Sequence, residues 1–175
     1  QEMATLVSDL LESERLATRH AALQREPTDL GALAAEVLRD LGARHPGASQ
    51  VRVHAQGDLA ALPLDAARIR LLLRNLLDNA LRHGAGAERP PELHLRHTAA
   101  GVEIEVRDHG PGVPEAQLQQ LAEPFYRPDS ARTRTAGGVG LGLYLCRLVA
   151  QAHGGTLTLR NAAPGLSAVV ALPGA

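Results

Sequence analysis

The chain has 175 residues, a formal net charge of −1 and an apolar fraction of 45%, so it has the size of one ordinary domain and enough apolar residues for a core. The small net charge argues against a general nucleic-acid-binding protein, because no basic excess is available to neutralise phosphates. All 18 cationic residues are arginine, and the lack of lysine excludes a Walker-type phosphate loop and any catalytic lysine.

The first predicted element is a helix over residues 1–26, with an apolar stripe that includes Met3, Leu6 and Leu10. Because this helix is too short to bury the stripe alone, we expect it to pack on a partner helix or on another chain. The pattern is already under way at Gln1, so we expect the chain to be part of a longer protein. No apolar run approaches 18 residues and no signal peptide is present, so we expect this piece to be soluble.

A second unit is predicted over residues 27–175. Helices are expected over 30–41, 65–84, 114–121 and 140–152, and strands or extended segments over 51–55, 59–62, 92–98, 102–107, 156–160 and 167–171. Residues 123–138 lack periodicity and are predicted to form a long mobile loop, a feature that usually carries function. This mixture predicts an α+β fold with helices on one face of a mixed sheet.

The only cysteine, Cys146, lies among leucines in the helix over 140–152 and is predicted to be a small core residue. It cannot form an internal disulfide, which fits a reducing, cytoplasmic setting.

The helix over residues 65–84 carries two stripes. Its apolar residues recur at the spacing of one buried face, and Asn75, Asn79, Arg82 and His83 form a polar stripe about a quarter turn away. Amides beside a buried face suggest the wall of a pocket, and carbonyl oxygens of this type are ligands that Mg²⁺ accepts. The same pattern also fits polar surface residues without a function.

Two further stretches could carry chemistry. Asp108 stands between a strand and the sequence Gly110-Pro111-Gly112, where its carboxylate could accept a hydrogen bond from an exocyclic amine or could merely start a turn. The glycine-rich run over 138–143 opens a helix whose free N–H groups suit a phosphate, although Leu143 breaks the dinucleotide-binding pattern.

Three arginines precede the glycine-rich run. Arg127, Arg132 and Arg134 could close on a polyphosphate or could remain solvated.

Four motifs follow one another along the chain: NLLDNALRH, DHGPG, EPFYRP and GGVGLGLYLC. In order and spacing they closely resemble the N, G1, F and G2 boxes of the ATP-binding catalytic domain of bacterial sensor histidine kinases. This domain has the Bergerat fold, a two-layer α/β sandwich shared with gyrase-type ATPases. The resemblance covers residues 28–173, and residues 1–26 look like the C-terminal part of the second dimerisation helix that precedes the domain.

The resemblance implies ATP and Mg²⁺ as cofactors. It makes Asn79 the principal Mg²⁺ ligand with Asn75 assisting, and it places Arg82 on phosphate and His83 at the border of the nucleotide. Asp108 would bind the adenine amino group.

Other matching positions shape the implied nucleotide pocket and its lid. Gly110 and Gly112 would form the adenine pocket, and Phe125 and Tyr126 would anchor one end of the lid. Arg127 and Arg132 would contact the γ-phosphate, so that with Asn75 they are the candidate catalytic residues. The implied lid hinge and phosphate cradle comprises Gly138, Val139, Gly140, Leu141, Gly142 and Leu143.

The implied activity is transfer of the ATP γ-phosphate to a histidine on a dimerisation domain that this chain lacks, and from there to a response regulator in two-component signalling. The usual acceptor motif, HExxxP, does not occur, and His20 is followed by AALQ. The resemblance further implies a homodimeric parent, with this domain as the cytoplasmic part of an inner-membrane sensor protein.

Two alternatives stay open from the sequence. A gyrase-like ATPase of the same fold would use a glutamate four residues before the Mg²⁺ asparagine, but Asn75 stands there and an amide cannot act as a general base. A regulatory or anti-sigma-type module would instead bind nucleotide in order to control a partner. The remaining histidines, at 45, 54, 94, 97, 109 and 153, show no metal-ligand spacing and are predicted to lie on the surface or in turns.

Overall fold

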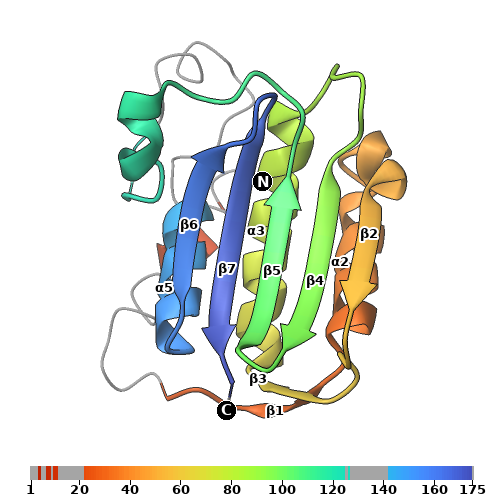
Figure 1. Cartoon of the computed structure of the whole chain (residues 1–175), viewed down its shortest axis with the longest axis vertical. Helices are drawn as coiled ribbons and strands as arrows, with labels where there is room; N and C mark the ends of the chain where they lie inside the picture. The colour runs from red at the N-terminus through yellow and green to blue at the C-terminus, as the bar shows by residue number, and fades with distance from the viewer. Residues whose placement is uncertain are drawn as a thin grey trace.

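A five-stranded mixed sheet with helices on one face organises the chain (Figure 1). The computed structural model describes residues 4, 7, 8, 10, 11, 22–124, 126 and 142–174. The strand order is β2-β4-β5-β7-β6, where β2 pairs with β4 in parallel and the other neighbours are antiparallel. These strands are β2 (Arg52–Gln56), β4 (Glu92–Thr98), β5 (Gly101–Arg107), β6 (Thr156–Asn161) and β7 (Leu166–Pro173).

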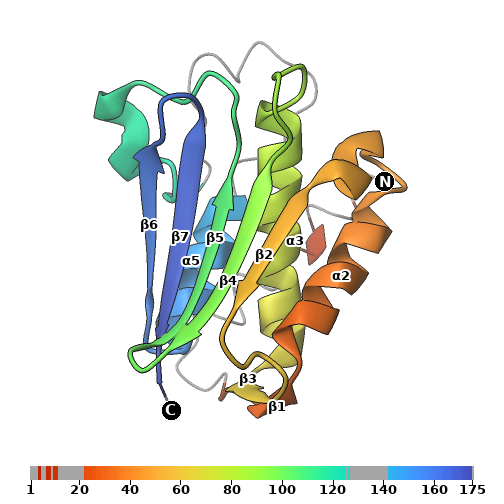
Figure 2. The same ribbon diagram turned by 45° about the vertical axis from the view of Figure 1, so that its right-hand side comes forward.

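Within residues 22–124 and 142–174, three α-helices lie behind the sheet, and the turned view shows the two layers separately (Figure 2). They are α2 (Leu30–Leu41), α3 (Ala66–His83) and α5 (Gly142–Ala152). The expected α+β arrangement is therefore confirmed. Short 3-10 helices, η1 (Pro46–Gln50) and η2 (Glu115–Gln120), connect the longer elements, and a two-stranded sheet joins β1 (Glu26–Thr28) to β3 (Leu62–Leu64).

The long helix α3 supplies the centre of the core. Its apolar stripe, predicted from the helical period, is almost completely buried at Ile69, Leu72, Leu73, Leu76 and Leu77. Burial of each such side chain contributes roughly 1.5–3 kcal/mol relative to an exposed one. Asp65 caps the first turn by accepting a hydrogen bond from the Arg68 amide at 3.2 Å, and Gly84 follows the last turn.

The local predictions differ from the structure at several element boundaries. The helix expected over 1–26 does not include residues 22–25, which are irregular, or Glu26, which begins β1. The segment expected at 59–62 is β3, shifted to Leu62–Leu64 by its pairing with β1. The helix expected over 114–121 is the 3-10 helix η2. In each case a tertiary contact or a proline-rich context outweighs the local pattern.

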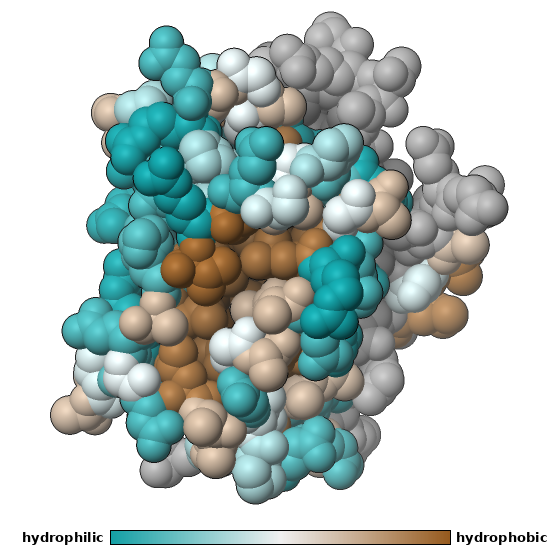
Figure 3. All heavy atoms as spheres, turned by 90° about the vertical axis from the view of Figure 1, so that its right-hand side faces the viewer, coloured by the Kyte–Doolittle hydropathy of each residue, from teal (hydrophilic) through white to brown (hydrophobic). Residues whose placement is uncertain are grey.

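The strand β2 lies at one edge of the sheet, and all five of its residues are exposed. The neighbours of Val53 along the strand point to the outer face of the sheet, so Val53 itself points to the helix side. It is nevertheless 47% exposed. The face of the molecule on this side has an apolar hollow bordered by polar groups (Figure 3). Among the described residues, no helix combines the length and the apolarity needed to cross a membrane.

Candidate functional site

The polar stripe of α3 faces the beginning of α5. A Cβ atom added to Gly142 would lie 3.2 Å from the Asn75 side-chain oxygen, so the two helices approach closely at this point. The Asn75 amide nitrogen donates to the Leu71 carbonyl at 2.9 Å, which directs the side-chain oxygen away from the helix backbone. The structure therefore brings the first motif next to Gly142 of the fourth one.

Further along the same stripe, Asn79 and Arg82 are half-buried and His83 is exposed. Arg82 forms an ion pair with Asp78 one turn earlier. The other carboxylate oxygen of Asp78 lies 2.7 Å from His45 Nε2. Burial raises the pKa of Asp78, but the hydrogen bonds and charges of Arg82 and His45 outweigh it and hold the pKa below its ordinary value. Asp78 thus holds the arginine that the resemblance assigns to phosphate.

Asp108 lies at the end of β5 with its carboxyl group buried. One carboxyl oxygen, Oδ1, accepts hydrogen bonds from the Gly110 amide at 2.9 Å and the Leu166 amide at 3.3 Å. Burial raises the pKa of Asp108 above its ordinary value, and these bonds together with the nearby imidazoles of His83 and His109 lower it only in part. The second oxygen can accept a hydrogen bond from a ligand amine. Asp108 therefore starts the turn at Gly110 and is also bonded to Leu166, so that its carboxyl group is held in place.

Close backbone packing holds the Asp108 loop against the end of α3. A Cβ atom at Gly110 would lie 2.1 Å from the His83 carbonyl oxygen, so a side chain cannot fit there. On the helix side, a Cβ atom at Gly84 would lie 2.8 Å from the Ala80 carbonyl oxygen and 3.2 Å from the Asp108 Cβ. The glycines let Asp108 approach the polar stripe of α3.

The turn between β6 and β7 fixes the other side of this loop. Asn161 makes two hydrogen bonds with the backbone of Val113, one to the amide at 3.0 Å and one to the carbonyl at 2.6 Å. Gly112 has φ +73°, and a Cβ atom there would lie 2.6 Å from the Asn161 oxygen. Gly165 has φ +93°, and its Cβ would lie 1.9 Å from the Asp108 carbonyl oxygen.

The structure thus describes ten of the predicted site residues. They are Asn75, Asn79, Arg82, His83, Asp108, Gly110, Gly112, Tyr126, Gly142 and Leu143. Tyr126 donates its backbone N–H to the Glu123 carbonyl at 3.3 Å, and Leu143 packs against the hydrophobic core. The other predicted site residues lie outside the described residues, namely Phe125, Arg127, Arg132, Gly138, Val139, Gly140 and Leu141, and so does Arg134.

Sequence reasoning missed three residues that build the site. Asp78 could have been found from its spacing of four residues before Arg82, which is the spacing of helical ion pairs. Asn161 and Gly165 belong to the sequence NAAPG, a recognisable turn, but nothing local indicates that this turn packs on Asp108.

His109 and His153 are not surface residues, because both are buried. His153 does stand in a turn, the one that follows α5, and His109 stands in the irregular segment after β5. His153 Nε2 accepts a hydrogen bond from the Asp65 amide, and Nδ1 lies 2.9 Å from the Val149 carbonyl, so the ring is neutral with its proton on Nδ1. Burial lowers the pKa of His153 although the bond to Val149 raises it in part.

Cys146 is a core residue as predicted, and burial raises the pKa of its thiol.

The geometry agrees with a comparison against protein families. Residues 64–174 match the family described as histidine kinase-, DNA gyrase B-, and HSP90-like ATPase. The chain belongs to this family. The match runs from the start of α3 through β7, so it contains every described residue of the site, and the chain includes an ATP-binding domain of this family.

Relatives within the family are sensor kinases. The chain is 36% identical over 166 residues to the probable sensor histidine kinase TcrY of Mycobacterium tuberculosis, covering 94% of this chain and 34% of that protein. It is 32% identical over 164 residues to the adaptive-response sensory kinase SasA of a Synechococcus strain, covering 92% of this chain and 42% of that protein. The chain thus spans about a third to two-fifths of their lengths.

Solved structures agree with the fold. The ATP-binding domain of PrrB from Mycobacterium tuberculosis is 31% identical, with a TM-score of 0.65 over 87% of this chain and 98% of that chain. Full-length ShkA, solved in complex with AMPPNP, gives a TM-score of 0.75 at 22% identity over 99% of this chain and 36% of that chain, a likeness of fold. Among the classes weighed from the sequence, these matches favour the sensor histidine kinases.

Proposed function

We propose that this chain is the catalytic ATP-binding part of a sensor histidine kinase, which transfers the ATP γ-phosphate to a histidine on a dimerisation domain outside the chain. The observation that carries the proposal is the buried Asp108 carboxylate, held between the end of α3 and the β6–β7 turn with one oxygen left for a ligand amine. The polar stripe of α3 leads from this carboxylate to the start of α5.

In this proposal the residues of the chain bind and orient the nucleotide. Asp108 accepts a hydrogen bond from the adenine amino group, and the tight packing of Gly110 on His83 keeps the loop in place. Arg82 is held by its ion pair with Asp78 at the edge of the site, and its guanidinium contacts a phosphate of the bound nucleotide. The attacking imidazole comes from the dimerisation domain.

The amide oxygens of Asn75 and Asn79 fit Mg²⁺ by their chemistry, since this ion prefers oxygen ligands and keeps several waters. Both side chains are half-buried on the same stripe, with Asn75 beside the first residue of α5. When bound, the ion neutralises charge on the triphosphate.

We further propose that residues 1–26 contain the end of the dimerisation helix and that residues 27–175 form the catalytic domain. The parent would be a homodimeric sensor in the inner membrane with this domain in the cytoplasm, and a response regulator would receive the phosphoryl group. The sensor-kinase names of the relatives support the response regulator as the partner.

Nucleotide binding tests the site. In the presence of Mg²⁺, Asp108→Ala should weaken binding of an ATP analogue by at least about tenfold, or ~1.4 kcal/mol. Asn79→Ala should weaken Mg²⁺-dependent binding to a similar extent. Asp40→Ala, at an exposed position on α2, is the matched control and should bind like the parent. Equal affinity of Asp108→Ala and the parent would contradict the adenine assignment.

Phosphoryl transfer tests the reaction. The chain is mixed with a separately produced acceptor helix pair and [γ-³²P]ATP, and acid-labile label on histidine is the expected product. Rapid phosphate release by the isolated chain without labelling would instead support a gyrase-like ATPase. Nucleotide binding with neither product would support a regulatory module.

A further inference from the structure

The outer face of the sheet, away from the helices, carries a cluster of histidine and glutamate side chains on β2 and β4. Leu93 and Leu95 of β4 are completely buried under the helices, so the alternating residues Glu92 and His94 point to the opposite face. His54 on the neighbouring strand β2 is the direct register partner of His94. Their imidazole rings stack with centroids 4.6 Å apart and an interplanar angle of 12°.

Glu92 completes a group of three possible metal ligands. Its Oε1 atom lies 3.1 Å from His94 Nε2. One ligand atom from each of His54, Glu92 and His94 lies within 4.8 Å of the others. The parallel pairing of β2 and β4 fixes the backbone of all three residues, so only side-chain rotation is needed to bring the ligand atoms together.

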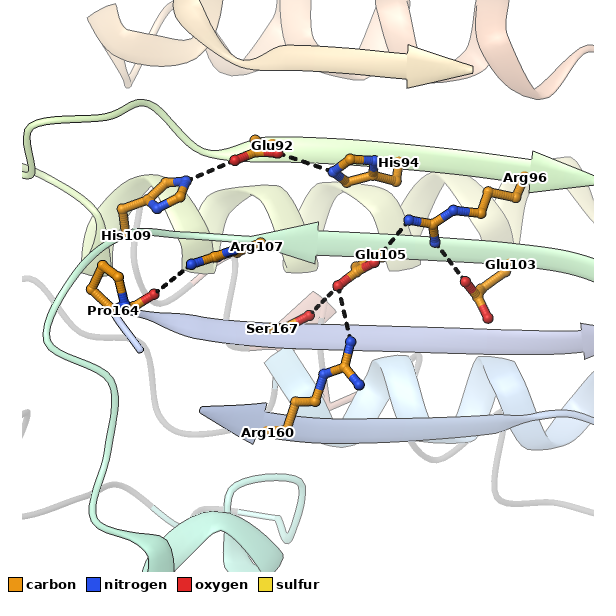
Figure 4. Close-up of polar contacts among 10 residues, drawn as sticks. All are labelled: Glu92, His94, Arg96, Glu103, Glu105, Arg107, His109, Arg160, Pro164 and Ser167. Atoms are coloured by element: carbon orange, nitrogen blue, oxygen red, sulfur yellow. Dashed lines mark hydrogen bonds and ion pairs between the residues drawn. The ribbon is translucent and has the colours of Figure 1, made fainter. Parts of the chain in front are cut away.

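A fourth residue orients the glutamate. His109 Nε2 lies 2.8 Å from Glu92 Oε2, and the His109 side chain is almost completely buried. Figure 4 shows Glu92 between His94 on one side and His109 on the other. Metal-binding carboxylates are commonly held by such an outer hydrogen bond, which fixes the direction of the free oxygen.

Charged side chains of β5 beside the cluster have partners outside it. Glu105 on β5, the register partner of His94, is paired with Arg96 at 3.1 Å and with Arg160 at 3.6 Å. Arg107, the β5 partner of Glu92, donates instead to the Ala162 and Pro164 carbonyls of the β6–β7 turn.

We propose that His54, Glu92 and His94 form a binding site for a divalent late first-row transition metal, with Zn²⁺ as the representative ion. Two imidazoles and one carboxylate are a ligand set that Zn²⁺ uses, and a water molecule takes the fourth position on the open side. Two ligands of one Zn²⁺ lie about 3–4 Å apart, because each bond is about 2 Å long. Mg²⁺ prefers oxygen ligands, so this site is chemically distinct from the nucleotide-binding stripe of α3.

Zinc titration of the whole chain tests the proposal. Calorimetry is done without nucleotide and with excess Mg²⁺, and we expect saturable binding of one Zn²⁺ per chain at micromolar concentration. His54→Ala and His94→Ala should each weaken binding by more than about tenfold, since even outer-shell changes commonly cost 10–100-fold. His97→Ala is the matched control on the same strand, because His97 contacts the Asp58 carbonyl outside the cluster, and it should bind like the parent.

Cobalt spectroscopy provides a second readout that does not depend on heat. Co²⁺ bound by the parent should give visible absorption bands of a low-coordinate site, and these bands should be lost in the His54→Ala/His94→Ala variant. Circular dichroism and binding of an ATP analogue should be unchanged in that variant, so that loss of the metal is separated from loss of the fold. The proposal is wrong if the double variant binds Zn²⁺ as tightly as the parent. It is equally wrong if the parent shows no saturable Zn²⁺ binding.

Discussion

Asp108 is the residue at which the loop, the sheet and the long helix meet. Its backbone amide donates to the Leu166 carbonyl at 3.0 Å, and its carboxylate accepts from Gly110 and Leu166. Its Cβ packs close to Gly84 at the end of α3. Because all of these contacts fix Oδ1 and the backbone, Oδ2 has a defined direction, and the residue can select a ligand by its hydrogen-bonding groups.

This geometry predicts discrimination between purine nucleotides. An exocyclic amine can donate to Asp108, whereas a carbonyl oxygen at the same position is a second acceptor and leaves both groups unpaired. We expect the parent to bind ATP at least about tenfold more tightly than inosine triphosphate, a loss of ~1.4 kcal/mol. In Asp108→Asn the ratio should fall, because the amide can also donate. Competition with a fluorescent nucleotide measures both affinities, with Asp40→Asn as control, and an unchanged ratio in Asp108→Asn would contradict the assignment.

Protonation of the same carboxyl predicts a pH dependence of binding. Burial raises the pKa of Asp108, so the group is protonated at a higher pH than an ordinary aspartate when the solution is acidified. Protonation places a hydrogen on the acceptor and opposes the adenine amine. ATP-analogue affinity in the parent should therefore fall on acidification with a midpoint above the ordinary pKa of aspartate. Asp108→Asn should lack this component, and an equal acid loss in both proteins would assign it to another group.

Gly112 gives a prediction on packing. Gly112 and Gly86 both have positive φ, +73° and +83°, so alanine is strained to a similar extent at each. Only at Gly112 would the new Cβ meet a neighbour, the Asn161 oxygen at 2.6 Å, whereas nothing lies within 4 Å at Gly86. Gly112→Ala should lower the free energy of unfolding by about 1–2 kcal/mol more than Gly86→Ala, because Asn161 must give up its bonds to Val113. Urea denaturation of both variants measures the difference, and equal losses would mean that Asn161 moves freely.

At the scale of elements, α3 contributes to both the core and the candidate site, because its apolar stripe is buried and its polar stripe borders the site. Asp78 joins Arg82 of its own helix to His45, which precedes η1. The lowered pKa of Asp78 means that these interactions stabilise the folded chain when the carboxylate is charged. Their contribution is present above the ordinary pKa of aspartate and is lost as the pH falls through the lowered value.

Asp78→Asn should therefore destabilise the chain by about 1 kcal/mol at neutral pH, as expected for a partly exposed charged network. The difference between variant and parent should shrink toward zero in acid, where both side chains are neutral. Urea denaturation across a pH series measures it, and Asp40→Asn serves as the exposed control. A difference that stays constant into acid would show that shape, and not charge, explains the effect.

The elements also show what the sequence could predict. The period of residues 65–84 located α3 and its buried stripe, and the strands β4 and β5 follow from alternating residues, because these signals are local. The contacts of His54 with His94, and of His109 with Glu92, join residues that are 40 and 17 positions apart. Spacing along one strand carries no information about such pairs, since the strand order decides which residues become neighbours. The same holds for Asn161 and the Asp108 loop.

At the scale of the whole molecule, residues 22–28 tie the N-terminal part of the chain to the domain. The Gln24 amide donates to the Asp65 carboxylate at 3.0 Å, where Asp65 also caps α3. The Arg25 guanidinium donates to the Pro63 carbonyl at 3.1 Å, and β1 pairs with β3 along its whole length. His153, which directly follows α5, accepts a hydrogen bond from the Asp65 amide at the same point.

This arrangement predicts where the chain can be shortened. A chain that starts at residue 22 keeps every contact of β1 and Asp65, so it should unfold within about 0.5 kcal/mol of the parent and bind an ATP analogue equally well. A chain that starts at residue 29 loses β1 and the Gln24 bond to Asp65, and we expect it to be less stable by about 2–3 kcal/mol. Urea denaturation and nucleotide titration of both chains measure the two effects. Equal stability of the two shortened chains would place the domain boundary after β1. A large loss already in the longer one would mean that residues 1–21 belong to the catalytic domain and do not form a separate dimerisation segment.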